Sequence, residues 1–120
     1  QRDLSGPCVL MSGGELTVTR TGDGSGGPNA EYALALALAL QGAPGIYGIA
    51  CDTDGVDGAE EVAGAMVTPE SLRGLRNLAE EALLQNDAHG FWGRAGGQIV
   101  TGPTLTNVND FRAIFVEPLA

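Results

Sequence analysis

A glycine-rich run followed by an alternating alanine and leucine stretch constrains the fold of this chain most. Four of the six residues from Gly22 to Gly27 are glycine, Pro28 follows, and alanine alternates with leucine from Ala33 to Leu40. The period of two is typical of a strand, but alanine and leucine are strong helix formers and no β-branched residue interrupts them. Composition therefore predicts a helix buried on nearly all sides, ended by Gly42.

A glycine loop that enters a helix is a candidate anion site. Glycine allows positive φ angles and a close approach of the backbone to a ligand, and Pro28 suits the first position of a helix. The unpaired N–H groups of the first turn and the helix dipole then favour a bound anion. A flexible turn before a buried helix explains the same composition, and both interpretations stay open.

Charge and length limit the class of protein. The 120 residues carry six lysine or arginine residues against 15 aspartate or glutamate residues, a net charge of −9. Nucleic acid and anionic membrane surfaces are held by basic side chains, so neither partner is expected. No apolar run approaches the roughly 20 residues that span a bilayer, and no signal peptide pattern begins the chain. We expect one domain over residues 1–120, cut from a larger protein.

The two cysteines indicate a reducing compartment. Cys8 and Cys51 both lie in apolar runs, which is typical of buried free thiols. A disulfide is the less favoured alternative. The sequence therefore predicts a cytoplasmic protein.

Strand and helix patterns alternate along the chain, which predicts an α/β fold: a layered domain with a mixed β-sheet flanked by helices. The run 46–51 is predicted as a central parallel strand because it is apolar throughout. A helix is expected to open at Thr68, Pro69 and Glu70, where capping and first-turn residues occur, and to continue in pieces to Leu84. A further helix is expected over 87–94. The other predicted strands are 7–12, 16–19, 98–100 and 111–116.

An acidic loop follows the predicted central strand. Asp52, Asp54 and Asp57 come directly after it, at the end where open α/β sheets bind ligands. Carboxylates at such a position suit Mg²⁺. The spacing excludes an EF-hand, because Val56 and Ala63 occupy ligand positions. The alternative is a plain turn, in which Asp and Gly serve the backbone.

Other polar segments complete the candidate site. The loop from Thr101 to Asp110 is rich in hydroxyl and amide groups, which orient hydroxylated or phosphorylated ligands. Glu15 follows the first strand and faces the same cleft or forms a surface ion pair. The single histidine, His89, is predicted to be a surface or structural residue and not a base. The sequence contains no nucleophile elbow and no P-loop.

Five ordered segments carry a resemblance to a known family. GGELTVT, GDGSGGPNAEYALALALAL, DTDGVDGAEEVAGAMV, NDAHGF and TGPTLTNVND resemble the C-terminal MOFRL domain of the glycerate 2-kinase family, also labelled hydroxypyruvate reductase. The resemblance covers nearly the whole chain. It implies a Rossmann-like N-terminal domain, absent from this chain, and an active site in the cleft between the two domains.

The resemblance implies ATP-dependent phosphorylation of D-glycerate to 2-phosphoglycerate, with ATP and Mg²⁺ as cofactors. Glycerate and the chain's own N-terminal domain are the implied partners, and a homodimer is a further candidate assembly. Two alternatives stay open: an NAD(P)H-dependent hydroxypyruvate reductase, and a degenerate, non-catalytic ligand-binding domain. The last is motivated by Pro28 and Leu105, where the family usually has arginine and glycine; Ala30 and Asp52 also depart from its pattern.

Matching positions imply roles for individual residues. Asp54 and Asp57 are the implied catalytic residues, with Asp54 also associated with the metal. The residues implied to bind substrate or phosphate are Glu15, Gly24, Gly26, Gly27, Asn29, Glu31, Thr104, Thr106 and Asn107.

Overall fold

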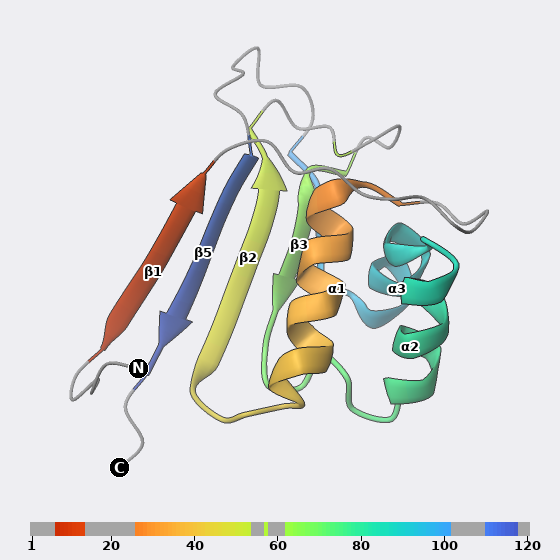
Figure 1. Ribbon diagram of the computed structural model, residues 1–120, viewed down its shortest axis with the longest axis horizontal. Coiled ribbons are helices and arrows are strands. Elements are labelled where there is room, and N and C mark those ends of the chain that lie inside the picture. The colour runs from red at the N-terminus through yellow and green to blue at the C-terminus, as the bar shows by residue number, and fades with distance from the viewer. Residues whose placement is uncertain (1–6, 14–25, 54–56, 58–61, 102–109, 118–120) are drawn as a thin grey trace.

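A five-stranded sheet and a group of three helices form the computed structural model of the chain (Figure 1). The structure describes residues 7–13, 26–53, 57, 62–101 and 110–117. The strand order is β1-β5-β2-β3-β4. The elements are β1 (Cys8–Gly13), α1 (Pro28–Leu40), β2 (Ile46–Asp52), β3 (Gly64–Val67), α2 (Arg76–Leu84), α3 (Ala88–Ala95), β4 (Gln98–Ile99) and β5 (Asp110–Val116).

The layered α/β fold is confirmed, but the expectation of a mixed sheet is wrong. Every strand pairing among the described residues is antiparallel, including those of the central strand β2 with β5 and β3. Parallel neighbours need a long crossover, usually a helix. β3 begins at Gly64, soon after β2 ends at Asp52, and sequence reasoning assigned it no element. The expected strand over 16–19 lies outside the described residues.

Helix α1 begins at Pro28 as predicted. It packs against β2 and β3, and α2 and α3 pack against it in turn (Figure 1). Its buried residues are Asn29, Ala30, Ala33, Leu34 and Ala37. Ala35 and Ala39, four residues apart, are exposed, so the prediction of a helix buried on nearly all sides is wrong for this face. Gln41, in the left-handed region at φ 51°, ends the helix one residue before the expected glycine, and its N–H donates to the Ala37 carbonyl.

The expected start of the second helix is wrong by several residues. The Thr68 hydroxyl accepts from the Glu70 N–H at 3.2 Å, as a capping residue does, but the chain then forms successive turns. The bonds Arg73 N–H to Glu70 O and Leu75 N–H to Leu72 O span three residues each. Gly74, at φ +70°, interrupts a continuous helix, so α2 begins only at Arg76.

The two faces of the sheet differ in their covering. Gly48 and Ala50 of β2 lie under α1, whereas their neighbours Tyr47 and Ile49 point to the opposite face. Register places five large, exposed side chains on that opposite face: Val9, Met11, Tyr47, Met66 and Phe115. We call them, with Ile49 and Ala113, the open sheet face. None of the helices in the described ranges is long and apolar enough to cross a membrane.

Candidate functional site

Strand ends that are far apart in sequence meet at one edge of the sheet. Gly13 pairs with Phe111, Asp52 with Asp110, and Gly64 with Cys51. The start of α1 lies at the same edge, at the top in Figure 1. We call this the loop edge. The described residues that flank the glycine, acidic and polar loops therefore converge there, as the sequence predicts for a shared site.

The Asp57 carboxylate caps α1 from outside the helix. It is fully buried, and its Oδ2 accepts from the Ala30 N–H at 2.8 Å. Its Oδ1 accepts from the Asn29 N–H at 2.9 Å and from Asn29 Nδ2 at 3.1 Å. These backbone N–H groups belong to the first turn, where the helix dipole favours an anion. The chain's own carboxylate thus takes the position that sequence reasoning reserved for a ligand.

Asn29 joins two acidic segments through one side-chain amide. Its Nδ2 also donates to Asp110 Oδ1 at 2.7 Å, across 81 residues of sequence. Because Nδ2 faces carboxylate oxygens on both sides, its assignment as the donor follows from the partners. Asn29 is fully buried and Asp110 nearly so. The predicted substrate-binding Asn29 therefore holds the acidic and polar loops to the helix start.

Gly26 and Gly27 lie against backbone and carboxylate atoms. A Cβ at Gly27 would lie 2.5 Å from Asp57 Oδ2, and one at Gly26 would lie 2.6 Å from the Asn86 carbonyl oxygen. Gly27 has an extended backbone, φ −156°, so its need for glycine is steric. The sequence predicted a close approach of this backbone to a ligand. At Gly26 and Gly27 the backbone instead approaches other residues of the protein, Asn86 and Asp57.

Glu31 binds the turn between α2 and α3. Its two carboxylate oxygens accept from Asn86 Nδ2 at 2.9 and 3.0 Å. Asn86 is buried and has a left-handed backbone, φ 53°. Its role was not predicted, although asparagine followed by aspartate in NDAHGF is a pattern that accompanies such turns.

α3 supplies two further buried groups at the start of α1. His89 Nε2 lies 3.0 Å from the Asp57 carbonyl oxygen and 3.4 Å from its Oδ2, and Trp92 Nε1 donates to the Ala30 carbonyl at 3.0 Å. His89 and Trp92 are both almost fully buried. The surface alternative for His89 is therefore wrong, and its interpretation as a structural residue and not a base stays a prediction.

A buried cation on β5 was missed by sequence reasoning. Arg112 is 7% exposed, its Nε donates to the Ser12 hydroxyl at 3.1 Å, and its guanidinium lies 5.5 Å from the Tyr32 ring centroid. It shares a strand face with Asp110, two residues away. No local signal in the sequence marks Arg112, because it lies in an otherwise largely apolar strand and the segment from Thr101 to Asp110 contains no lysine or arginine.

Several predicted site residues lie outside the described part of the chain. They are Glu15, Gly24, Asp54, Thr104, Thr106 and Asn107. Among the residues that are described, no group of three or more His, Cys, Asp or Glu side chains is arranged to hold a metal ion. Both Asp57 oxygens accept N–H groups. The described residues alone therefore do not form a Mg²⁺ site.

The loop edge also raises the pKa of the Cys51 thiol above its usual value. Partial burial is the main cause, followed by the negative charges of Asp52, Asp110 and Asp57. Neither Cys51 nor Cys8 forms a disulfide, as predicted, but both are half-buried instead of buried.

We expect the Cys51 thiol to react slowly at neutral pH. In a Cys8→Ser variant, iodoacetamide alkylation should rise with pH at a higher midpoint than for N-acetylcysteine, because the folded protein disfavours the thiolate. The midpoint should fall in urea, where burial and the three nearby charges are lost. A midpoint at or below that of N-acetylcysteine would contradict a raised pKa for the Cys51 thiol.

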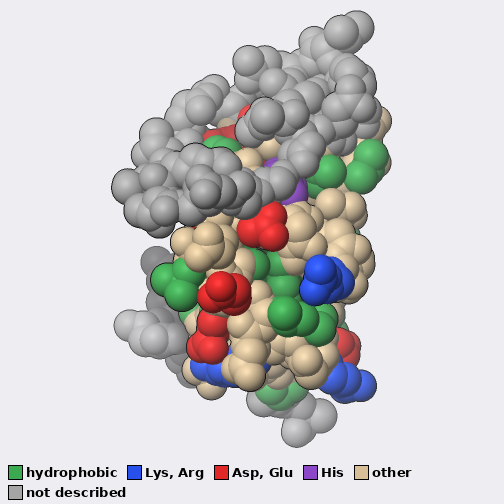
Figure 2. Space-filling model, turned by 90° about the vertical axis from the view of Figure 1, so that its right-hand side faces the viewer, with side chains coloured by type: hydrophobic (Ala, Val, Ile, Leu, Met, Phe, Trp, Pro, Cys, Tyr) green, Lys and Arg blue, Asp and Glu red, His purple; other side chains and the backbone are tan. Residues whose placement is uncertain are grey.

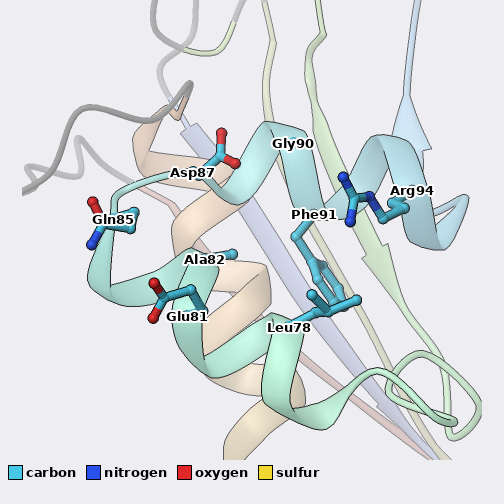
Figure 3. Close-up of a pocket in the computed structure, with 8 residues that line it drawn as sticks. All are labelled: Leu78, Glu81, Ala82, Gln85, Asp87, Gly90, Phe91 and Arg94. Atoms are coloured by element: carbon cyan, nitrogen blue, oxygen red, sulfur yellow. The ribbon is translucent and has the colours of Figure 1, made fainter.

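A hollow between α2 and α3 lies apart from the predicted residues. It measures about 160 Å³, with Leu78, Ala82 and Phe91 along its base. Glu81, Gln85 and Asp87 lie on one side and Arg94 on the other (Figure 3). On the face shown in Figure 2, acidic, basic and apolar side chains of the described residues are intermixed. None of the lining residues is a predicted site residue.

The described residues form an α/β domain in which the strand ends that flank the polar segments meet near the capped start of one helix. A model described as the MOFRL family matches residues 8–110, and the chain belongs to that family. The structure of glycerate kinase from Thermotoga maritima superposes with a TM-score of 0.86 at 36% identity, over 90% of this chain and 27% of that one.

Curated relatives bear two different names. A "Putative hydroxypyruvate reductase" of Agrobacterium vitis is 48% identical over 94% of this chain and 27% of its own length. The D-glycerate 2-kinase of Thermotoga maritima is 39% identical over 91% of this chain and 27% of its own length. The glycerate kinase of Homo sapiens is 38% identical over 94% of this chain and 24% of its own length. The chain thus spans about a quarter of the length of these relatives.

Proposed function

We propose that this chain is the C-terminal part of a glycerate 2-kinase that phosphorylates D-glycerate to 2-phosphoglycerate with ATP and Mg²⁺. The likeness to the Thermotoga maritima glycerate kinase, at a TM-score of 0.86, carries the proposal. The convergence of the polar loop ends at the loop edge supports it, because phosphoryl transfer depends chiefly on positioning and charge neutralisation.

In this proposal the residues that the resemblance named take different roles. Asp54 serves as the metal-associated residue, while Glu15, Gly24, Thr104, Thr106 and Asn107 contact glycerate or phosphate. Asp57, whose oxygens already accept N–H groups, acts as a positioning residue that fixes Asn29 and the start of α1. This changes the catalytic role that the resemblance implied for Asp57.

We propose further that a second domain of the same polypeptide packs on this one and completes the site at an interdomain cleft. Relatives about four times as long support this arrangement. The open sheet face supports it as well, because contiguous apolar side chains on a surface are typical of interfaces. The net charge of −9 gives a second copy of this chain less support as the partner.

The function is tested with the full-length protein that contains this chain. Incubation with ATP, Mg²⁺ and D-glycerate should yield 2-phosphoglycerate. Enolase added to the assay converts this product to phosphoenolpyruvate, whose absorbance measures its formation. No product at saturating substrate and Mg²⁺ would contradict the proposal. Activity that appears only after Pro28→Arg would favour the degenerate-domain alternative, since arginine supplies an anion contact that proline lacks.

The name of the Agrobacterium vitis relative favours one second candidate, reduction of hydroxypyruvate. It predicts oxidation of NADH or NADPH that depends on hydroxypyruvate, measured at 340 nm on the same preparation. The glycine run lies between β1 and α1, and β2 follows α1. β5 lies between β1 and β2 and is antiparallel to both, so these strands do not form the adjacent parallel pair of a dinucleotide-binding βαβ unit, which favours the kinase.

A further inference from the structure

His89 donates from a defined ring nitrogen. Its Nε2 faces two oxygen atoms of Asp57, the backbone carbonyl at 3.0 Å and Oδ2 at 3.4 Å. Both are acceptors, since the carbonyl has no proton and Oδ2 already accepts the Ala30 N–H. A bare Nε2 would place its lone pair against them. The partners therefore assign a proton to Nε2.

The opposite nitrogen supports the same assignment. His89 Nδ1 is buried and has no hydrogen-bond partner within the described residues. In the other neutral tautomer the Nδ1 proton would be buried without an acceptor among these residues, which is unfavourable. Only the tautomer with hydrogen on Nε2 satisfies the contact with Asp57.

We propose that His89 is a positioning residue for the loop edge, which acts through Asp57 on the first turn of α1. This inference rests on the proposed function, because the first turn carries Asn29 and Glu31, two residues expected to contact the ligand. His89 fixes Asp57, and Asp57 in turn accepts from Asn29 and Ala30.

α3 is suited to hold His89 in register with α1. Trp92, three residues further along the same helix, donates to the Ala30 carbonyl. Asn86, just before α3, donates to Glu31. His89 thus lies between two other hydrogen bonds that join the α3 region to the first turn of α1. If the contact between His89 and Asp57 is lost, these two bonds keep the helices together, and the change is confined to Asp57 and the first turn of α1.

The tautomer is tested by NMR of the ¹⁵N-histidine-labelled chain, which contains a single histidine. Two-bond correlations to the ring protons should identify Nε2 as the nitrogen that bears hydrogen. A spectrum showing hydrogen on Nδ1 alone would overturn the proposal.

The coupling to α1 is tested by two variants of similar volume. His89→Gln places its Nε2 donor close to the original one, whereas His89→Met removes the donor and keeps an unbranched side chain. In the methionine variant, the Asn29 and Ala30 amides should exchange with solvent about tenfold faster, the effect of one lost hydrogen bond. The glutamine variant should stay near the parent. Equal exchange in both variants would overturn the proposal.

The consequence for the reaction is tested in the full-length protein. His89→Met should raise the KM for glycerate and lower kcat, both restored by His89→Gln, with Arg76→Gln on the exposed face of α2 as the unaffected control. Faster amide exchange with unchanged kinetics in the methionine variant would overturn the positioning role. If the parent itself lacks kinase activity, the proposed function fails, and the NMR and exchange results still decide the link between His89 and α1.

Discussion

Replacing Asp57 with alanine is expected to lower the free energy of unfolding of this chain by at least about 3 kcal/mol, because each buried N–H group that loses its acceptor costs about 1–3 kcal/mol. Three N–H groups of Asn29 and Ala30 lose their acceptor, and His89 loses its contact with Oδ2. None of these groups gains access to water, because Asp57 is fully buried. The N-terminal end of the α1 dipole is also left without its anion.

Urea unfolding, followed by the fluorescence of the only tryptophan, measures this loss. Asp57→Asn should lose most of the same stability. In asparagine an NH₂ group replaces one carboxylate oxygen, so a donor would face an N–H group that is itself a donor. Glu80→Gln is the control, since its pair with Arg76 spans 3.8 Å on the surface and contributes about 0–1 kcal/mol. A loss in Asp57→Ala no larger than in Glu80→Gln would contradict the capping role.

Local patterns predicted most of the fold. The composition of the alanine and leucine run identified α1, and short apolar runs between turn residues located β1, β2, β4 and β5. Strand direction could not be obtained in this way, because apolar content throughout β2 is typical of any central strand, parallel or antiparallel. Only four residues form β3, and two of them are glycine and alanine, so it lacked the β-branched pattern.

The site was predicted as a group of loops but not as a network. Asp57 and Asn29 are 28 residues apart, and Asn29 and Asp110 are 81 apart. Pairings over such distances depend on how the sheet brings strand ends together, which no local pattern encodes. The sequence therefore indicated the polar residues of the loop edge but predicted an external anion at the first turn of α1. No local pattern showed that the Asp57 carboxylate accepts from the N–H groups of this turn.

This difference bears on where a phosphate or carboxylate ligand binds. An anion at the first turn of α1 would have to displace Asp57 from the Asn29 and Ala30 N–H groups. Two anions cannot share those donors without strong repulsion. On the proposed function, the ligand is therefore expected to be bound by side chains near the start of α1 and not by these two backbone N–H groups.

Replacing Gly27 with alanine tests whether the start of α1 depends on close packing. The added Cβ would lie 2.5 Å from Asp57 Oδ2 and 2.6 Å from both its Cγ and its carbonyl oxygen. The extended backbone at Gly27 accepts alanine, so the whole cost is steric. We expect a loss of about 1–3 kcal/mol in urea unfolding, the range for overpacking. Gly13→Ala at the same edge is the matched control, because its Cβ would meet the Asp110 carbonyl oxygen at 3.5 Å, an ordinary contact.

A double-mutant cycle then separates the carboxylate from the backbone. In an Asp57→Ala background two of the three close atoms, Oδ2 and Cγ, are absent, so Gly27→Ala should cost about 1 kcal/mol less than in the parent. Equal costs in both backgrounds would contradict a fit between Gly27 and the Asp57 carboxylate. A coupling of this sign would show that the last glycine of the GSGG run is required by a side chain of the protein itself. Because Gly26 also packs within the protein, against Asn86, the proposed ligand contact of the run would then rest on Gly24.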